Sequence, residues 1–168
     1  SPLQLLNGLI GLKPAIAYFA YTQLVLNNMI DVKTGNIKIS DSFELAPKSN
    51  FSMLEGQDLG QSHILRDMGN GYKWLDIKNI HVDDEYFNIS LCFKEELLIE
   101  LDLIVSNEKF RLSSDWSSWS DEKEKLKLKS CQDWLDKELG GKTNFHWGNV
   151  RSSYDLKSGA SSIGIRYS

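Results

Sequence analysis

Residues 87–105, FNISLCFKEELLIELDLIV, decide the fold class of this chain of 168 residues. Apolar side chains occupy every second position of residues 87–93 and again of residues 97–105. A period of two predicts two β-strands that each bury one face. The short Lys94-Glu95-Glu96 segment then joins them as an antiparallel pair, and Glu100 and Asp102 are expected on the exposed face.

Further strand signals lie on both sides of this stretch. Two short apolar runs flank Lys33-Thr34-Gly35-Asn36, and two more flank Gly69-Asn70-Gly71, which are sequences typical of hairpin turns. Residues 41–61 read as a long loop with one helical turn. The predicted strands cover residues 29–32, 37–39, 63–68, 72–77, 87–93, 97–105, 110–112, 144–150 and 162–167. Together they indicate a largely antiparallel sheet.

One helix is expected between residues 117 and 139. Ser117, Ser118 and Ser120 are candidate N-caps, and acidic residues follow them, as the positive end of a helix dipole favours. Apolar residues recur at helical spacing as far as Leu139, and Gly140 ends the pattern. The predicted fold is therefore α+β: an antiparallel meander packed by one main C-terminal helix, forming a single domain over residues 29–168.

The first 28 residues differ in composition, because Lys13 is their only charged side chain. Pro14 interrupts the apolar stretch near its middle, so a membrane span of about 20 apolar residues is not expected. We interpret residues 1–28 as an apolar helical segment that packs on the domain. An exchanged arm in a dimer and a weak membrane contact remain open, as does a natural start at Met29.

Charge excludes one class of function and suggests another. The net charge is −4, whereas a general nucleic-acid binder needs a basic surplus. Residues 76–108 hold nine acidic residues against Lys78 and Lys94, which predicts a local negative field and a basic protein partner. The candidate partner-binding residues are Asp83, Asp84, Glu85, Glu95, Glu96, Glu100 and Asp102. Acidic hairpins that only keep exposed strands soluble are the alternative.

Signals for catalysis or cofactors are few. His81 beside Asp83 and Asp84 is the one histidine–carboxylate neighbourhood, and a hydrated turn explains it as well. The two cysteines, Cys92 and Cys131, fit no zinc motif, and no phosphate loop or dinucleotide fingerprint is present. We therefore expect no metal and no cofactor.

The last third of the chain carries a recognisable pattern. It runs from Trp116-Ser-Ser-Trp119 through Trp134-Leu135 and Trp147-Gly148-Asn149-Val150 to Ile163, Ile165 and Tyr167. This pattern resembles small bacterial immunity proteins of contact-dependent and other polymorphic toxin systems. The resemblance implies a non-enzymatic, cytoplasmic protein that binds and blocks one toxin domain, often a nuclease. No binding residues are transferred with it.

The sequence-based hypothesis is occlusion of a toxin through the acidic surface. Strand addition to residues 97–105 is a second mode, if that strand lies at the sheet border. The competing class is a small-ligand protein or enzyme with a pocket between sheet and helix near His81 or His146. No stable membrane insertion is expected, and the oligomeric state is left open.

Overall fold

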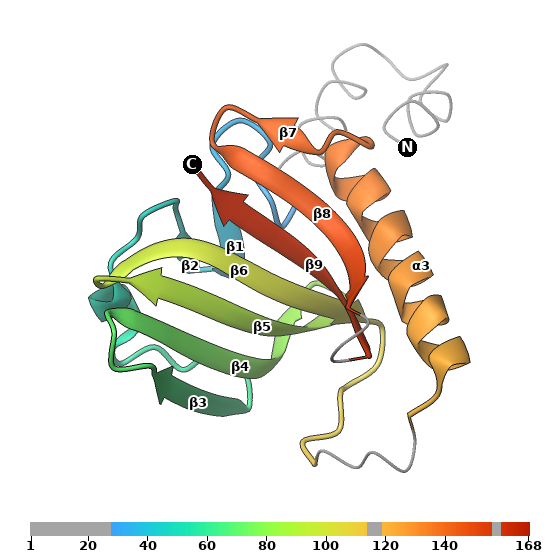
Figure 1. Ribbon diagram of the computed structural model, residues 1–168, viewed down its shortest axis with the longest axis horizontal. Helices are drawn as coiled ribbons and strands as arrows, with labels where there is room; N and C mark the ends of the chain where they lie inside the picture. Colours follow the sequence, from blue (N-terminus) through green and yellow to red (C-terminus); the bar gives the residue numbers. More distant parts are fainter. Residues whose placement is uncertain (1–27, 114–118, 156–158) are drawn as a thin grey trace.

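The computed structural model describes residues 28–113, 119–155 and 159–168, and its regular structure is α+β (Figure 1). A seven-stranded sheet has the order β3-β4-β5-β6-β9-β8-β7, and every neighbouring pair is antiparallel. A second sheet contains β1 and β2. The elements are β1 (Ile37–Ser40), β2 (Phe43–Leu45), the 3-10 helix η1 (Phe51–Leu54), β3 (Ser62–Asp67), β4 (Tyr72–Val82), β5 (Glu85–Lys94), β6 (Leu97–Ser106), α3 (Asp121–Leu139), β7 (Asn144–Phe145), β8 (Gly148–Asp155) and β9 (Ala160–Tyr167).

The helix α3 begins and ends as its sequence predicts. Ser120 Oγ accepts a hydrogen bond from the Lys123 backbone N–H at 3.2 Å, and Gly140 adopts a left-handed φ of 63°. Of the predicted N-cap serines, Ser120 is therefore the one that caps the helix. α3 packs on the β6, β9 and β8 part of the sheet and runs alongside β8 and β9 in Figure 1.

The core lies on one face of the large sheet. Trp134 of α3 meets Phe87 of β5 in an edge-to-face contact with 5.7 Å between the ring centroids. At the other part of the sheet β1 packs against β4, so α3 and the small sheet share the same core cluster. No described helix or sheet packs on the opposite face, which is called the open face below.

The β5–β6 pair confirms the predicted strands but contains a bulge that the alternation did not reveal. Cys92 pairs with Glu100 and Phe93 pairs with Leu98, so Ile99 is an extra residue in β6. A bulge moves the following side chains to the other face. Leu97, expected inside, is 41% exposed, whereas Leu98 is fully buried.

Two other strand predictions were wrong, and the single strand predicted for residues 144–150 is divided between β7 and the start of β8. Residues 110–112 form no strand, because the Asn79 side chain bonds both backbone groups of Phe110: its Oδ1 accepts from the N–H at 2.8 Å and its Nδ2 donates to the carbonyl at 2.8 Å. A side chain thus takes the place of a neighbouring strand. Residues 29–32 form only a bridge between Ile30 and Ile37, and the partner of β1 is β2, which lies in the predicted loop.

Residues 28–37 are held by three distant side chains. Glu138 Oε2 accepts from the Ile30 N–H at 3.2 Å, Trp147 Nε1 donates to the Val32 carbonyl at 3.0 Å, and Tyr167 Oη donates to the Gly35 carbonyl at 2.9 Å. The apolar helical segment predicted for residues 1–28 lies outside the described residues, apart from Asn28.

Candidate partner-binding surface

The structure separates the seven predicted acidic residues into three groups. Asp83, Asp84 and Glu85 lie at the β4–β5 turn, Glu95 and Glu96 at the β5–β6 turn, and Glu100 with Asp102 within β6. The two turns lie at opposite ends of β5, about 30 Å apart at roughly 3.3 Å per residue. Neighbours in sequence therefore do not form one continuous acidic patch.

The β4–β5 turn presents two exposed carboxylates. Asp83 has a left-handed φ of 53°, a conformation that Asp tolerates better than most residues. Glu85 is partly buried, and its Oε2 accepts a hydrogen bond from Trp134 Nε1 at 3.0 Å. Asp83 and Asp84 are exposed and have no ion pair within the part of the chain that the structure describes. This turn is therefore anchored to α3 and free to meet a cation.

A groove of about 650 Å³ lies between α3 and the β5–β6 pair and reaches the β4–β5 turn at Glu85. Its apolar lining includes Ile104, Phe110, Trp134 and Leu126, which is 65% exposed. Apolar side chains beside charged ones are typical of the centre and rim of a protein–protein interface. The basic residues Lys123, Lys127 and Lys137 also line the groove, so the negative end of this surface is the turn.

The β5–β6 turn makes more contacts with the rest of the chain than the β4–β5 turn does. Both central residues have left-handed backbones, with φ of 48° at Glu95 and 70° at Glu96. The Glu96 carboxylate is paired with Lys73, and its carbonyl accepts from the Phe51 N–H at 2.8 Å. Glu95 is exposed, whereas Glu96, directly before β6, is bonded to Lys73 of β4 and to Phe51 of η1.

The third group belongs to a mixed-charge row on the open face. Arg166 of β9 donates to Glu100 Oε2 at 3.0 Å. Asp102 lies opposite Gly164, beyond which Arg151 of β8 follows in register. Packing on the sheet removes water from Asp102 and raises its pKa; Glu100 raises it further, while Arg151 and Arg166 oppose this. Glu100 is therefore paired with an arginine, and Asp102 is exposed beside two arginines, so this row is mixed in charge rather than acidic.

The same row continues to the other edge of the sheet. Arg66 of β3 makes a two-pronged ion pair with Asp76 of β4 at 2.9 and 3.0 Å, and Ser90 Oγ of β5 donates to Asp76 at 2.6 Å. Sequence reasoning missed Arg66, Asp76 and the two arginines of β8 and β9. The alternation in each strand could place them on one face, but their grouping needs the strand order.

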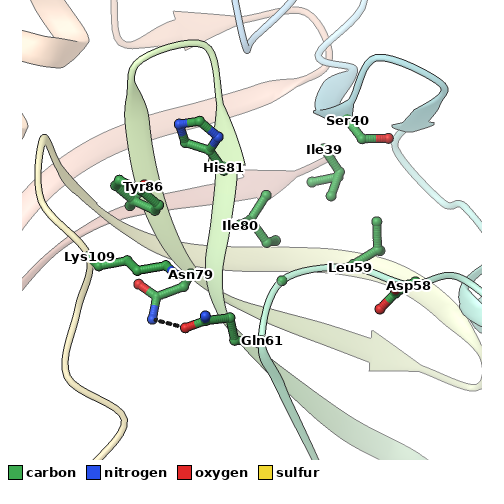
Figure 2. Close-up of a pocket in the computed structure, with 11 residues that line it drawn as sticks. Ile39, Ser40, Asp58, Leu59, Gln61, Asn79, Ile80, His81, Tyr86 and Lys109 are labelled. Atoms are coloured by element: carbon green, nitrogen blue, oxygen red, sulfur yellow. Dashed lines mark hydrogen bonds between the residues drawn. The ribbon is translucent and has the colours of Figure 1, made fainter.

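A cavity of about 360 Å³ lies beside His81, and Figure 2 shows the residues that line it. The His81 ring stacks on Tyr86 with 4.6 Å between centroids, and Asn79 donates to Gln61 at 3.0 Å. Lys109 lies below Tyr86 in this view. The lining comes from β1, the 58–61 loop, β4, β5 and Lys109, whereas the predicted pocket lay between sheet and helix. His146 is exposed in the β7–β8 turn.

Cysteine and metal chemistry have little support in the geometry. Cys92 is buried, and burial raises its pKa to about 11. Burial also raises the pKa of Cys131, as its place on the apolar face of the helix predicts. Among the described residues no group of three or more His, Cys, Asp or Glu side chains could hold a metal ion.

Comparisons with family models, curated proteins and solved structures find no match to this chain. The resemblance to immunity proteins therefore remains a prediction. Within the described ranges no helix is long and apolar enough to cross a membrane.

Proposed function

We propose that this protein is a non-enzymatic immunity-type protein that binds a basic toxin domain in the cytoplasm and blocks it. The observation that carries the proposal is the β4–β5 turn, where Asp83 and Asp84 are exposed without an ion pair among the described residues. Glu85 and Trp134 hold this turn beside the apolar groove. A basic side chain of the partner would meet the turn, and apolar side chains would enter the groove.

This assignment ranks the seven candidate acids. Glu96 and Glu100 already have intramolecular cations, and Asp102 faces Arg151 and Arg166. An acid that must exchange an internal partner for an external one gains less from binding. Asp83 and Asp84 are therefore the primary contacts, and Glu85, whose carboxylate accepts from Trp134, supports their turn. Glu95 is exposed but adjoins the paired Glu96 at the opposite end of β5, so it is secondary together with Glu96, Glu100 and Asp102.

The test is capture of the partner from host lysate at low salt by the wild-type protein and by Asp83→Lys/Asp84→Lys. We expect one basic protein at near-equal stoichiometry with the wild type, and at least about tenfold less with the variant, since opposed charges slow association. The captured protein must then inhibit growth when expressed alone, and the wild-type chain must restore growth.

A matched control is Glu44→Lys/Glu55→Lys, which makes the same charge change at two exposed positions outside the set of candidate acids. Equal capture by the control and the wild type places binding at the β4–β5 turn. Equal loss in both reversed proteins contradicts the site, because only total charge would then matter. A captured partner that has no effect on growth contradicts the immunity function.

The cavity beside His81 favours one alternative, a small-ligand protein or enzyme. Asp58, Lys109 and the stacked His81–Tyr86 pair give it charged groups and an aromatic surface. His81→Ala separates the two functions, because it leaves partner capture unchanged under the immunity proposal. Loss of capture with this variant would favour a role for the cavity.

A further inference from the structure

Strand β3 is one edge of the seven-stranded sheet, and no other described strand pairs with its outer side (Figure 1). Ile64 and Leu65 are 49% and 51% exposed, and Met68, directly after the strand, is 56% exposed. Natural edge strands are usually protected by charged side chains, above all Lys, by Pro, by a bulge or by a very short length. Residues 62–67 contain neither Pro nor Lys and pair with β4 without a break in register. Their charged residues are Arg66, which is paired with Asp76 of β4, and Asp67 at the end of the strand.

Hydrogen bonding at the end of β3 shows which backbone groups face outward. The Met68 N–H donates to the Tyr72 carbonyl at 3.0 Å, and on the other side of β4 the Gly71 carbonyl accepts from the Glu95 N–H at 2.7 Å, so the even-numbered residues of β4 face β3. In an antiparallel pair the residues that bond to the partner strand alternate with residues that face away from it. Ser62, Ile64 and Arg66 therefore bond to β4, since each lies an even number of residues from Met68. His63, Leu65 and Asp67 direct their N–H and C=O groups outward.

We propose that this edge pairs with β3 of a second copy of the chain, antiparallel and centred on Leu65. In that register each Leu65 faces the Leu65 of the other copy, and His63 faces Asp67 in both directions. Every outward N–H and C=O of the strand then has a backbone partner. The two sheets become one continuous sheet around a two-fold axis.

The sequence of β3 is complementary to itself in this register. A two-fold axis perpendicular to the sheet keeps each side chain on its own face, so residues opposite each other must share a face. His63, Leu65 and Asp67 lie on the core face beside Ile77, Leu75 and Lys73. The imidazole of His63, whose Nε2 contacts the Leu59 carbonyl within the chain, is thus opposite a carboxylate at both ends, with a leucine pair between them.

A register centred on Ile64 is less favourable. It pairs His63 with Leu65 and places Asp67 opposite Gln61, whose N–H already donates to the Lys78 carbonyl, so the Asp67 carbonyl is left without a partner. The Leu65 register also places Ile64 opposite Arg66 on the open face, where the arginine stem can cover it. The interface is small, so we expect a weak dimer with a dissociation constant of about 10 µM to 1 mM.

The test is sedimentation of the full chain between about 5 µM and 1 mM. We expect the mass of the wild type to rise from 19.1 kDa toward twice that value. Leu65→Pro should weaken the dimer at least about tenfold, because it removes an outward N–H that β4 does not use. Leu65→Lys serves the same purpose should the proline variant not fold, and Leu126→Lys is the control for removing an exposed leucine elsewhere.

Amide hydrogen exchange provides a second measurement on the unmodified protein. Protection of the His63, Leu65 and Asp67 amides should increase with concentration, while the Ile64 and Arg66 amides stay protected at every concentration. A wild type that remains monomeric up to 1 mM overturns the proposal. So does a Leu65 variant that dimerises like the wild type, or a dimer in which only even-numbered amides change. None of these outcomes depends on the toxin partner.

Discussion

Glu138 Oε2 accepts a hydrogen bond from the backbone N–H of Ile30 at 3.2 Å, although 108 positions separate the two residues. The backbone carbonyl of Glu138 also accepts from Asn28 Nδ2 at 3.3 Å. Burial raises the pKa of the Glu138 carboxyl to about 7, and nearby Glu85 adds to this, while the Ile30 and Met29 N–H groups and Lys137 lower it. The last turn of α3 therefore holds the start of the described chain through a group that titrates near neutral pH.

Stability is expected to fall as the pH rises through this pKa. The folded pKa lies above the ordinary value of 4.5 for a glutamate, so the folded state binds the proton more tightly than the unfolded state. The contribution is fully present below about pH 4.5 and is lost as the pH rises through about 7. At about 1.4 kcal/mol per pKa unit, up to about 3 kcal/mol is involved.

Urea unfolding of the wild type and Glu138→Gln at pH 5, 6, 7 and 8 measures this effect. The glutamine carries no charge at any of these pH values, so the difference in unfolding free energy between the two proteins should change across the series. A difference that stays constant from pH 5 to pH 8 would show that Glu138 does not titrate there.

Replacing Gly35 by alanine is expected to destabilise the protein strongly. A Cβ at this position would lie 2.5 Å from Trp147 Cδ2, and the φ of +77° adds backbone strain. Gly56→Ala is the matched control, because its φ is +73° but no atom lies within 4 Å of the added Cβ. Backbone strain alone costs about 1–2 kcal/mol. Urea unfolding should show a clearly larger loss for Gly35→Ala, and equal losses would contradict the close packing against Trp147.

The Asn79 side chain is expected to hold the loop around Phe110 in place. Asn79→Gly permits the left-handed φ of 55° but removes the bonds to Gln61 and Phe110. We expect a loss of about 1–3 kcal/mol in unfolding free energy and faster exchange of the Phe110 amide. Lys48→Gly, at an exposed position with φ of 63°, should be neutral or stabilising. An unchanged exchange rate of the Phe110 amide would argue against this role of the Asn79 side chain.

Both thiols are expected to react slowly with a disulfide reagent at pH 8. Cys92 and Cys131 are buried, and burial raises the pKa of each, so little thiolate forms. Unfolding in urea should release both thiols at the normal rate. Rapid labelling of either one in the native protein would show that its surroundings open readily.

The fold follows from the sequence where local pattern decides it. The alternation in residues 87–105 gives the central strands, and Ser120 and Gly140 give the bounds of α3. The bulge at Ile99 was not predicted, because it depends on the register between two strands rather than on one strand's own pattern. Likewise β2 has only three residues, too few for an alternation to be recognised, and it is a strand because it pairs with β1.

The candidate site was less predictable for a similar reason. Two turns joined by one strand must lie at its opposite ends, so the separation of Asp83 from Glu95 is already implied by the predicted hairpin. The pairing of Glu100 with Arg166 is not implied by the predicted hairpin, because it depends on the insertion of β9 between β6 and β8. This insertion also excludes strand addition to residues 97–105, since β6 is an inner strand.

The three contacts that hold residues 28–37 have a consequence for synthesis on the ribosome. Their partners Glu138, Trp147 and Tyr167 are translated long after the segment itself. The inner strand β9 is also late, and it joins β6 to β8. The nascent chain can therefore form the β3-β4-β5-β6 meander early, but its first described residues must wait until residue 167 has left the exit tunnel.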